Sequence, residues 1–146
     1  MSIFQTLSIS GSALTANRLK LDVVSSNIAN ANTARGRLVN GEWQPYRRKM
    51  VEMTPNKPPT FMNYLQQELS LSGVHVNKIV EDTTPFQAVY DPSNPDSNKQ
   101  GYVMMPNVDV TKEMVDLMST SRAYEANVTA FNAGKSMLLK ALEIGR

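Results

Sequence analysis

Few side chains in this sequence are of the types that carry out catalytic or metal chemistry. His75 is the only histidine, and the 146 residues include no cysteine. Because a zinc site usually takes three or four histidine, cysteine or carboxylate ligands, this set predicts no such site. The missing cysteines also exclude disulfides and thiolate nucleophiles. Composition leaves a Ser-His-Asp triad open, but no serine lies in the Gly-x-Ser-x-Gly turn that presents a hydrolase nucleophile.

The remaining chemical motifs are equally sparse. His75 lies in the stretch Gly73-Val-His-Val76, whose alternation is typical of a half-buried strand rather than a catalytic loop. The glycines are scattered singly, so no glycine-rich loop is present that could hold a phosphate. Residues 91–96 resemble an acidic calcium loop only superficially, because the glycine and the terminal glutamate of that motif are missing. We therefore expect no enzyme, no cofactor, no metal and no small-molecule substrate.

The charge distribution argues against a nucleic-acid partner. Net charge is +2, and positive and negative side chains are spread along the whole chain. Nucleic-acid binders usually concentrate basic charge on one face or element. The only basic cluster is Arg47, Arg48 and Lys49, and the nearby Glu42 and Glu52 favour a solvated strand or loop there.

The first segment, residues 1–34, contains no proline and is predicted to be a helix. A seven-residue repeat keeps one stripe of a helix facing a partner, since the helix turns nearly twice in seven residues. The row of apolar residues at this spacing is Leu7, Leu14, Leu21 and Ile28.

The last segment, residues 108–146, repeats the pattern more clearly and is also predicted to be a helix. Asp109 or Thr111 can serve as its N-cap. One heptad row is Val110, Leu117, Tyr124, Phe131 and Leu138. The second expected row is Met114, Ser121, Val128, Lys135 and Leu142.

The central segment, residues 35–107, contains all eight prolines. Alternating patterns predict strands at residues 73–76 and 86–90, with a more polar candidate at 46–53, and residues 61–69 could form a short helix. The sequence therefore predicts an α+β fold in which long N- and C-terminal helices pair as a coiled coil. A small, irregular, mostly antiparallel β-rich insert connects them.

Several apolar side chains lie outside the seam of a two-helix pair. Ile9, Val23, Met118 and Met137 would need a cover, and oligomerisation would supply one. The alternative is that the insert folds back over them in an ordinary α+β monomer. No stretch is long and apolar enough to span a membrane. The beginning lacks the order of a signal peptide, so we expect a cytoplasmic protein or one exported without cleavage.

The string Ser25-Ser-Asn-Ile-Ala-Asn-Ala-Asn-Thr33, followed by Gly36, resembles the N-terminal signature of bacterial flagellar axial proteins, the rod and hook subunits. Locally, Asn30, Asn32 and Thr33 can bond helix-end or turn backbone groups, and Gly36 permits positive φ. Further matching strings are Ile9 to Ala16, Gln44-Pro-Tyr-Arg47, Tyr90-Asp-Pro92, Gly101 to Val110, Glu113-Met-Val115, Ser121 to Val128 and Lys135-Ser-Met137.

The resemblance runs nearly end to end and is greatest to subunits of the proximal rod. One departure is the Ala34-Arg35 pair, where related chains often place proline or another residue before the glycine. The signature positions that the resemblance assigns are Asn27, Asn30, Asn32, Thr33, Gly36, Asn107, Arg122, Tyr124 and Asn127.

The resemblance implies a subunit of the flagellar basal body, exported without cleavage by the flagellar type III apparatus. Its partners would be further copies of itself and other rod subunits in a helical tube, with no direct membrane insertion. The expected assembly interface is the set of heptad positions Leu7, Leu14, Leu21, Ile28, Val110, Met114, Leu117, Tyr124, Val128, Phe131, Leu138 and Leu142. Two alternatives stay open: another subunit of the flagellar axis, or a cytoplasmic coiled-coil adaptor.

Overall fold

The computed structural model describes residues 3–39, 41–56 and 73–144. In chain order its elements are α1 (Ile3–Ala29), β1 (Arg37–Val39), β2 (Glu42–Gln44), β3 (Lys49–Pro55), β4 (Val74–Glu81), β5 (Gln87–Tyr90), β6 (Tyr102–Met105) and α3 (Val110–Ile144). The strands form three separate antiparallel pairs, β1–β2, β3–β4 and β5–β6. The two long terminal helices and the small antiparallel pairs between them confirm the predicted α+β class.

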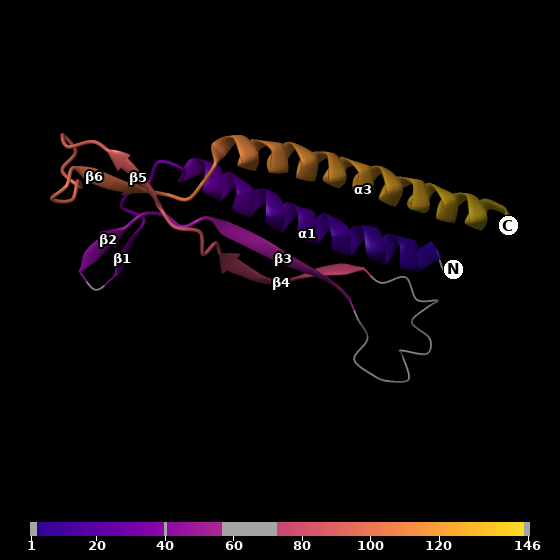
Figure 1. Cartoon of the computed structure of the whole chain (residues 1–146). Helices are drawn as coiled ribbons and strands as arrows, with labels where there is room; N and C mark the ends of the chain where they lie inside the picture. Colours follow the sequence, from indigo (N-terminus) through magenta and orange to yellow (C-terminus); the bar gives the residue numbers. More distant parts are fainter. Residues whose placement is uncertain (1–2, 40, 57–72, 145–146) are drawn as a thin grey trace.

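Helix α1 is the middle layer of the molecule. It lies between α3 on one side and the β3–β4 hairpin on the other, and α3 runs antiparallel to it (Figure 1). Because two neighbours cover it, Ala16, Val23 and Val24 are fully buried within one chain. Of the two covers considered for Val23, the structure therefore has the alternative one, within a single chain, whereas Met118 and Met137 stay exposed. Among the side chains of α1 that the structure describes, the exposed ones are Phe4, Ser8, Thr15, Arg18, Asp22, Ser25 and Ala29.

The β3–β4 hairpin confirms two of the predicted strand segments. Its register pairs Thr54 with His75 and Lys49 with Glu81, and a bulge between Glu52 and Met53 shifts the pairing. The start of β4 is fixed to α1, since the Ser12 hydroxyl accepts a hydrogen bond from the amide of Val74, the first residue of the strand, at 3.1 Å. This hairpin thus acts as a third layer that follows α1 along its length.

The other two hairpins lie together at the end of the molecule opposite the chain termini (Figure 1). Gly41 in the β1–β2 turn has φ of 87°, and Gly101 before β6 has φ of 80°, conformations that favour glycine. In β5–β6, the rings of Tyr90 and Tyr102 meet edge to face with centroids 5.3 Å apart. The segment at 86–90 was predicted as a strand, whereas β1, β2 and β6 were not.

The helix boundaries differ from the expected ones mainly at the end of α1. The predicted helix extended to residue 34, but α1 ends at Ala29. Beyond it the backbone bonds tighten, since the amides of Ala31 and Thr33 bond the carbonyls of Ile28 and Asn30, three residues back. At the start of α3, Asp109 is the N-cap, and its carboxylate accepts from the amides of Thr111 and Lys112. The short helix considered at 61–69 lies outside the described residues.

Candidate assembly interface and the polar junction behind it

The seam, meaning the face of α3 that contacts α1, contains four of the five residues of the first predicted heptad row, whereas Val110, the first of that row, is exposed. Leu117, Tyr124, Phe131 and Leu138 are half-buried against α1. On α1, the predicted row Leu7, Leu14, Leu21 and Ile28 is also half-buried. These eight side chains are therefore partly covered inside a single subunit, by its own helices and the segments next to them.

The second row was predicted wrongly. The residues that accompany the Leu117 row are Glu113, Thr120, Asn127 and Gly134, three of which are buried and Asn127 half-buried. They are small or polar and allow close approach: a methyl group on Gly134 would lie 3.3 Å from a methyl carbon of Leu7. The expected row instead points sideways or outward, with Ser121 and Val128 half-buried and Met114, Lys135 and Leu142 exposed.

The outward side of α3 carries apolar side chains in its first turns. Val110, Met114, Val115 and Met118 are between 37% and 56% exposed. Val110, Met114 and Met118 follow one another at a spacing of four, so they form a stripe beside the seam. Soluble monomers rarely leave contiguous apolar side chains uncovered without a binding role.

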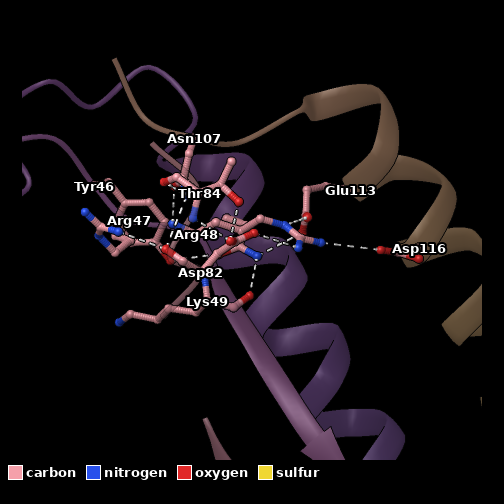
Figure 2. A network of polar contacts seen from close by, with 10 residues as sticks. Tyr46, Arg47, Arg48, Lys49, Asp82, Thr84, Asn107, Glu113 and Asp116 are labelled. Atoms are coloured by element: carbon pink, nitrogen blue, oxygen red, sulfur yellow. Dashed lines mark hydrogen bonds and ion pairs between the residues drawn. The ribbon is translucent and has the colours of Figure 1, made fainter. Parts of the chain in front are cut away.

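A polar junction holds this end of α3 to the rest of the chain (Figure 2). Glu113 is fully buried and accepts two hydrogen bonds, from Arg48 Nε at 2.6 Å and from Asn27 Nδ2 at 2.9 Å. Asn27 also bonds both backbone groups of Lys49, and its Oδ1 accepts from the hydroxyl of Tyr46 at 3.0 Å. The amide of Asn27 thereby joins the end of α1, the start of β3 and the first turn of α3.

Arg48 lies at the centre of the junction. Its side chain is 21% exposed and also faces Asp82 at 3.4 Å and Asp116 at 3.8 Å. Burial by itself lowers the pKa of Arg48, but the hydrogen bonds and charges of Glu113 and Asp82 outweigh burial and raise it. Arg48 therefore stays charged inside the junction, and the expectation of a solvated basic cluster was wrong for this residue.

The loop after β4 and the segment before α3 complete the junction. The side chain of Asn107 accepts from the amide of Arg48 at 2.8 Å and donates to the carbonyl of Thr84 at 3.1 Å. The hydroxyl and amide of Thr84 donate to Asp82, and these hydrogen bonds, followed by Arg48, lower the pKa of Asp82. Arg47 lies over the ring of Phe86, 4.5 Å from its centroid.

The other signature residues serve mostly as turn and helix contacts. The side chain of Asn30 accepts from the hydroxyl of Thr33 at 3.3 Å, which closes the turn after α1. Gly36 does not have positive φ, contrary to the expectation. It is needed for space, because a methyl group there would lie 2.6 Å from the amide nitrogen of Tyr46.

Three further signature residues do not belong to the junction. Asn32 and Arg122 are exposed, and within the described ranges neither side chain takes part in a hydrogen bond or ion pair. The side chain of Asn127 donates to the carbonyl of Ala123 on its own helix. Arg48, Asp82 and Glu113 were missed as a group, although a polar Asn27 between Val24 and Ile28 was a signal that a buried polar contact existed.

The residues considered for chemistry contact neighbouring side chains of the same chain. His75 is exposed on β4, and its two ring nitrogens face Thr54 and Asn56 at 3.1 and 2.6 Å. Asp96 forms an ion pair with Arg35. Within residues 3–39, 41–56 and 73–144, no group of three or more His, Cys, Asp or Glu side chains could hold a metal ion. Neither described helix has the apolar length that crossing a bilayer requires.

The comparisons with known proteins identify the family. The model described as "Flagella basal body rod protein" matches residues 7–35, and the one described as "Flagellar basal body rod FlgEFG protein C-terminal" matches residues 99–144. The flagellar basal-body rod protein FlgC of Bacillus subtilis (strain 168) is 56% identical, with 100% of both chains covered.

Two more distant relatives carry the same name. FlgC of Borreliella burgdorferi is 42% identical over 99% of this chain and 98% of its own. FlgC of Escherichia coli O6:H1 is also 42% identical, over 100% of both chains. With such identity along the whole length, this chain belongs to the FlgC family of flagellar basal-body rod proteins.

Proposed function

We propose that this chain is a structural, non-enzymatic subunit of the flagellar basal-body rod that assembles through the outer apolar stripe of α3. Membership of the FlgC family supports the rod subunit and its place in the basal body. The observation that supports the contact surface is the exposure of Val110, Met114 and Met118 on one side of a helix whose other side is occupied by α1.

The polar junction supports this proposal because it fixes the position of that stripe. The stripe begins at Val110, three residues before Glu113, which bonds to Asn27 of α1 and to Arg48 just before β3. A surface that is already fixed in the free subunit loses little conformational entropy when it assembles, and this smaller cost favours binding. Methionine side chains adapt to differently shaped neighbours, and this property suits the unequal contacts of a helical tube.

The finer architecture is also part of the proposal. Residues 1–34 and 108–146 form one coiled-coil unit, and residues 35–107 form a β-rich unit that faces outward and packs on α1 through β3 and β4. The row Leu117, Tyr124, Phe131 and Leu138 supports coiled-coil packing, since it repeats every seven residues on the contact face. The exposed Arg122 and Glu125 would then set the register between neighbouring subunits.

The partners are other copies of this chain and other rod subunits, and the export apparatus delivers the chain without cleavage.

Expression of Met118→Asp in a strain that lacks the gene tests the contact surface. We expect this variant to be stable but absent from isolated basal bodies, because the stripe would contain a charge. Ser119→Asp adds the same charge to the next exposed residue, on another side of α3, and should be incorporated. Normal incorporation of Met118→Asp would refute the assignment of this surface.

A further inference from the structure

The end of the molecule opposite the chain termini carries a pocket between the β1–β2 and β5–β6 hairpins (Figure 1). Its volume is about 480 Å³, which lies in the range of pockets that bind small molecules. Two kinds of side chain line it: flat aromatic or apolar ones, and polar ones that keep hydrogen-bonding groups for a ligand. A molecule that fits this pocket must therefore combine an apolar surface with several polar groups.

The apolar part of the lining is formed by Trp43 of β2 with Tyr102 and Met104 of β6. These side chains are 56%, 41% and 50% exposed, so their surfaces are open to a ligand. The ring of Tyr102 is held edge to face by Tyr90, with the two centroids 5.3 Å apart. A ring fixed in this way presents an electron-rich face, on which the C–H side of a sugar ring can stack.

An ion pair supplies the first polar groups. Arg35 Nε donates to both carboxylate oxygens of Asp96, at 3.0 and 2.8 Å. The hydrogen bonds from Arg35 lower the pKa of Asp96, so this carboxylate is ionised at neutral pH and accepts hydrogen bonds only. Within the residues that the structure describes, Arg35 Nη1 has no partner, so it can donate to a ligand beside an oriented carboxylate.

Asn98 and Glu42 supply the remaining polar groups of the lining. Asn98 Oδ1 accepts from the amides of Gln100 and Tyr102 at 2.9 and 3.0 Å, which fixes the side chain and leaves its NH₂ group as a donor. The carboxylate of the exposed Glu42 has no ion-pair partner in the described part of the chain. The pocket thus offers donors and acceptors on planar side chains, most of them held in place before a ligand arrives.

We infer that this pocket binds a pyranose unit of a neutral oligosaccharide. The apolar face of the sugar ring stacks on Trp43 and Tyr102, and its hydroxyl groups, each both donor and acceptor, bond to the planar polar side chains. Two negative side chains, Glu42 and Asp96, face one positive side chain, Arg35, so a phosphate or nucleotide is disfavoured.

The same polar groups disfavour a purely apolar ligand, which would leave them without partners. The inference goes beyond the proposed function, and the pocket is separate from the outward side of α3 that the proposed function uses.

Trp43 is the only tryptophan, so its fluorescence reports directly on the pocket. The test is a titration of the full chain with the trimer of N-acetylglucosamine and, separately, with maltotriose. Each is added up to about 10 mM, where a site with a Kd of about 1 mM is nearly saturated. We expect a saturable shift of the emission to shorter wavelength with at least one of them, because the indole leaves water. Sorbitol, a polyol without a ring, is the control and should cause no shift.

Two full-length variants test the stacking contact. Tyr102→Leu keeps the apolar bulk but removes the flat ring, so it should weaken binding at least about tenfold. Phe4→Leu makes a similar change at an exposed position near the opposite end of the molecule and should bind like the native chain.

The inference is wrong if neither trisaccharide shifts the emission, if sorbitol shifts it equally, or if Tyr102→Leu binds as tightly as the native chain. The first two outcomes need no variant that must fold. Incorporation into basal bodies is tested separately by Met118→Asp, so failure of the pocket and failure of the proposed function are distinguishable.

Discussion

Replacement of Glu113 by glutamine removes the buried charge at the polar junction while keeping its shape. Both carboxylate oxygens of Glu113 accept hydrogen bonds, one from Arg48 and one from Asn27. Glutamine offers a single acceptor oxygen, so its amide nitrogen must face one of these two donors. Arg48 would also lose its nearest counter-charge and keep only Asp82 at 3.4 Å and Asp116 at 3.8 Å.

The expected loss of stability follows from these contacts. One buried donor left without an acceptor costs about 1–3 kcal/mol. Breaking a buried ion pair by removing one partner costs about 3–5 kcal/mol, and the remaining carboxylates reduce that figure here. We therefore expect Glu113→Gln to lower the free energy of unfolding by about 2–4 kcal/mol, a large part of the total for a domain of this size.

Urea unfolding of the full chain, followed by far-ultraviolet circular dichroism, measures this difference. Glu125→Gln is the matched control, because Glu125 is exposed on the same helix and its loss should change stability by less than about 0.5 kcal/mol. Replacing both Arg48 and Glu113 by methionine should cost less than the sum of the two single changes. If Glu113→Gln unfolds at the same urea concentration as the control, the junction does not stabilise the fold.

Four other substitutions have defined outcomes. The hydrogen bonds of Thr84 and the charge of Arg48 lower the pKa of Asp82 in the folded chain. The ionised carboxylate therefore stabilises the fold at pH values above the pKa of an unfolded aspartate, about 3.9. This stabilisation is lost as the pH falls through the lower pKa of the folded state. Stability measured against pH should accordingly fall more steeply below about pH 4 in the native chain than in Asp82→Asn; parallel curves would contradict this. Gly36→Ala should destabilise the chain by more than about 1 kcal/mol, whereas Gly11→Ala, in a helix with open space around it, should stabilise it by up to about 1 kcal/mol. Asp109→Ala should cost about 0.5–2 kcal/mol through loss of the N-cap, and an unchanged thermal midpoint would refute that role.

The elements that the sequence predicted well are those with long periodic patterns. Helix α3 and its row from Leu117 to Leu138 were predicted because four apolar residues at a spacing of seven leave little choice of face. Asp109 was one of two proposed caps for the same local reason. Helix termini and periodic faces depend on neighbouring residues, which a single sequence contains.

The second row of the seam was predicted wrongly because apolarity was the only criterion. Thr120 and Gly134 are buried for their small size, since the helices approach closely there. Glu113 is buried because charged and amide partners reach it from two other elements. Neither cause is visible in a hydropathy pattern.

The polar junction was not predicted at all, because it depends on contacts between distant parts of the chain. Asn27 and Glu113 are 86 residues apart in sequence, and Arg48 comes from a third segment, just before β3. The short strands β1, β2 and β6 have three or four residues each, too few for a clear alternation. The family string around Asn27 marked the right place, but its physical role needed the three-dimensional arrangement.

The most direct test of the account is electron microscopy of basal bodies isolated from the source bacterium after in-frame deletion of this gene. The account predicts that rods, hooks and filaments are all missing, and that the intact gene restores them. Normal hooks and filaments in the deletion strain would contradict it, and a role as a cytoplasmic coiled-coil adaptor would then explain the sequence better.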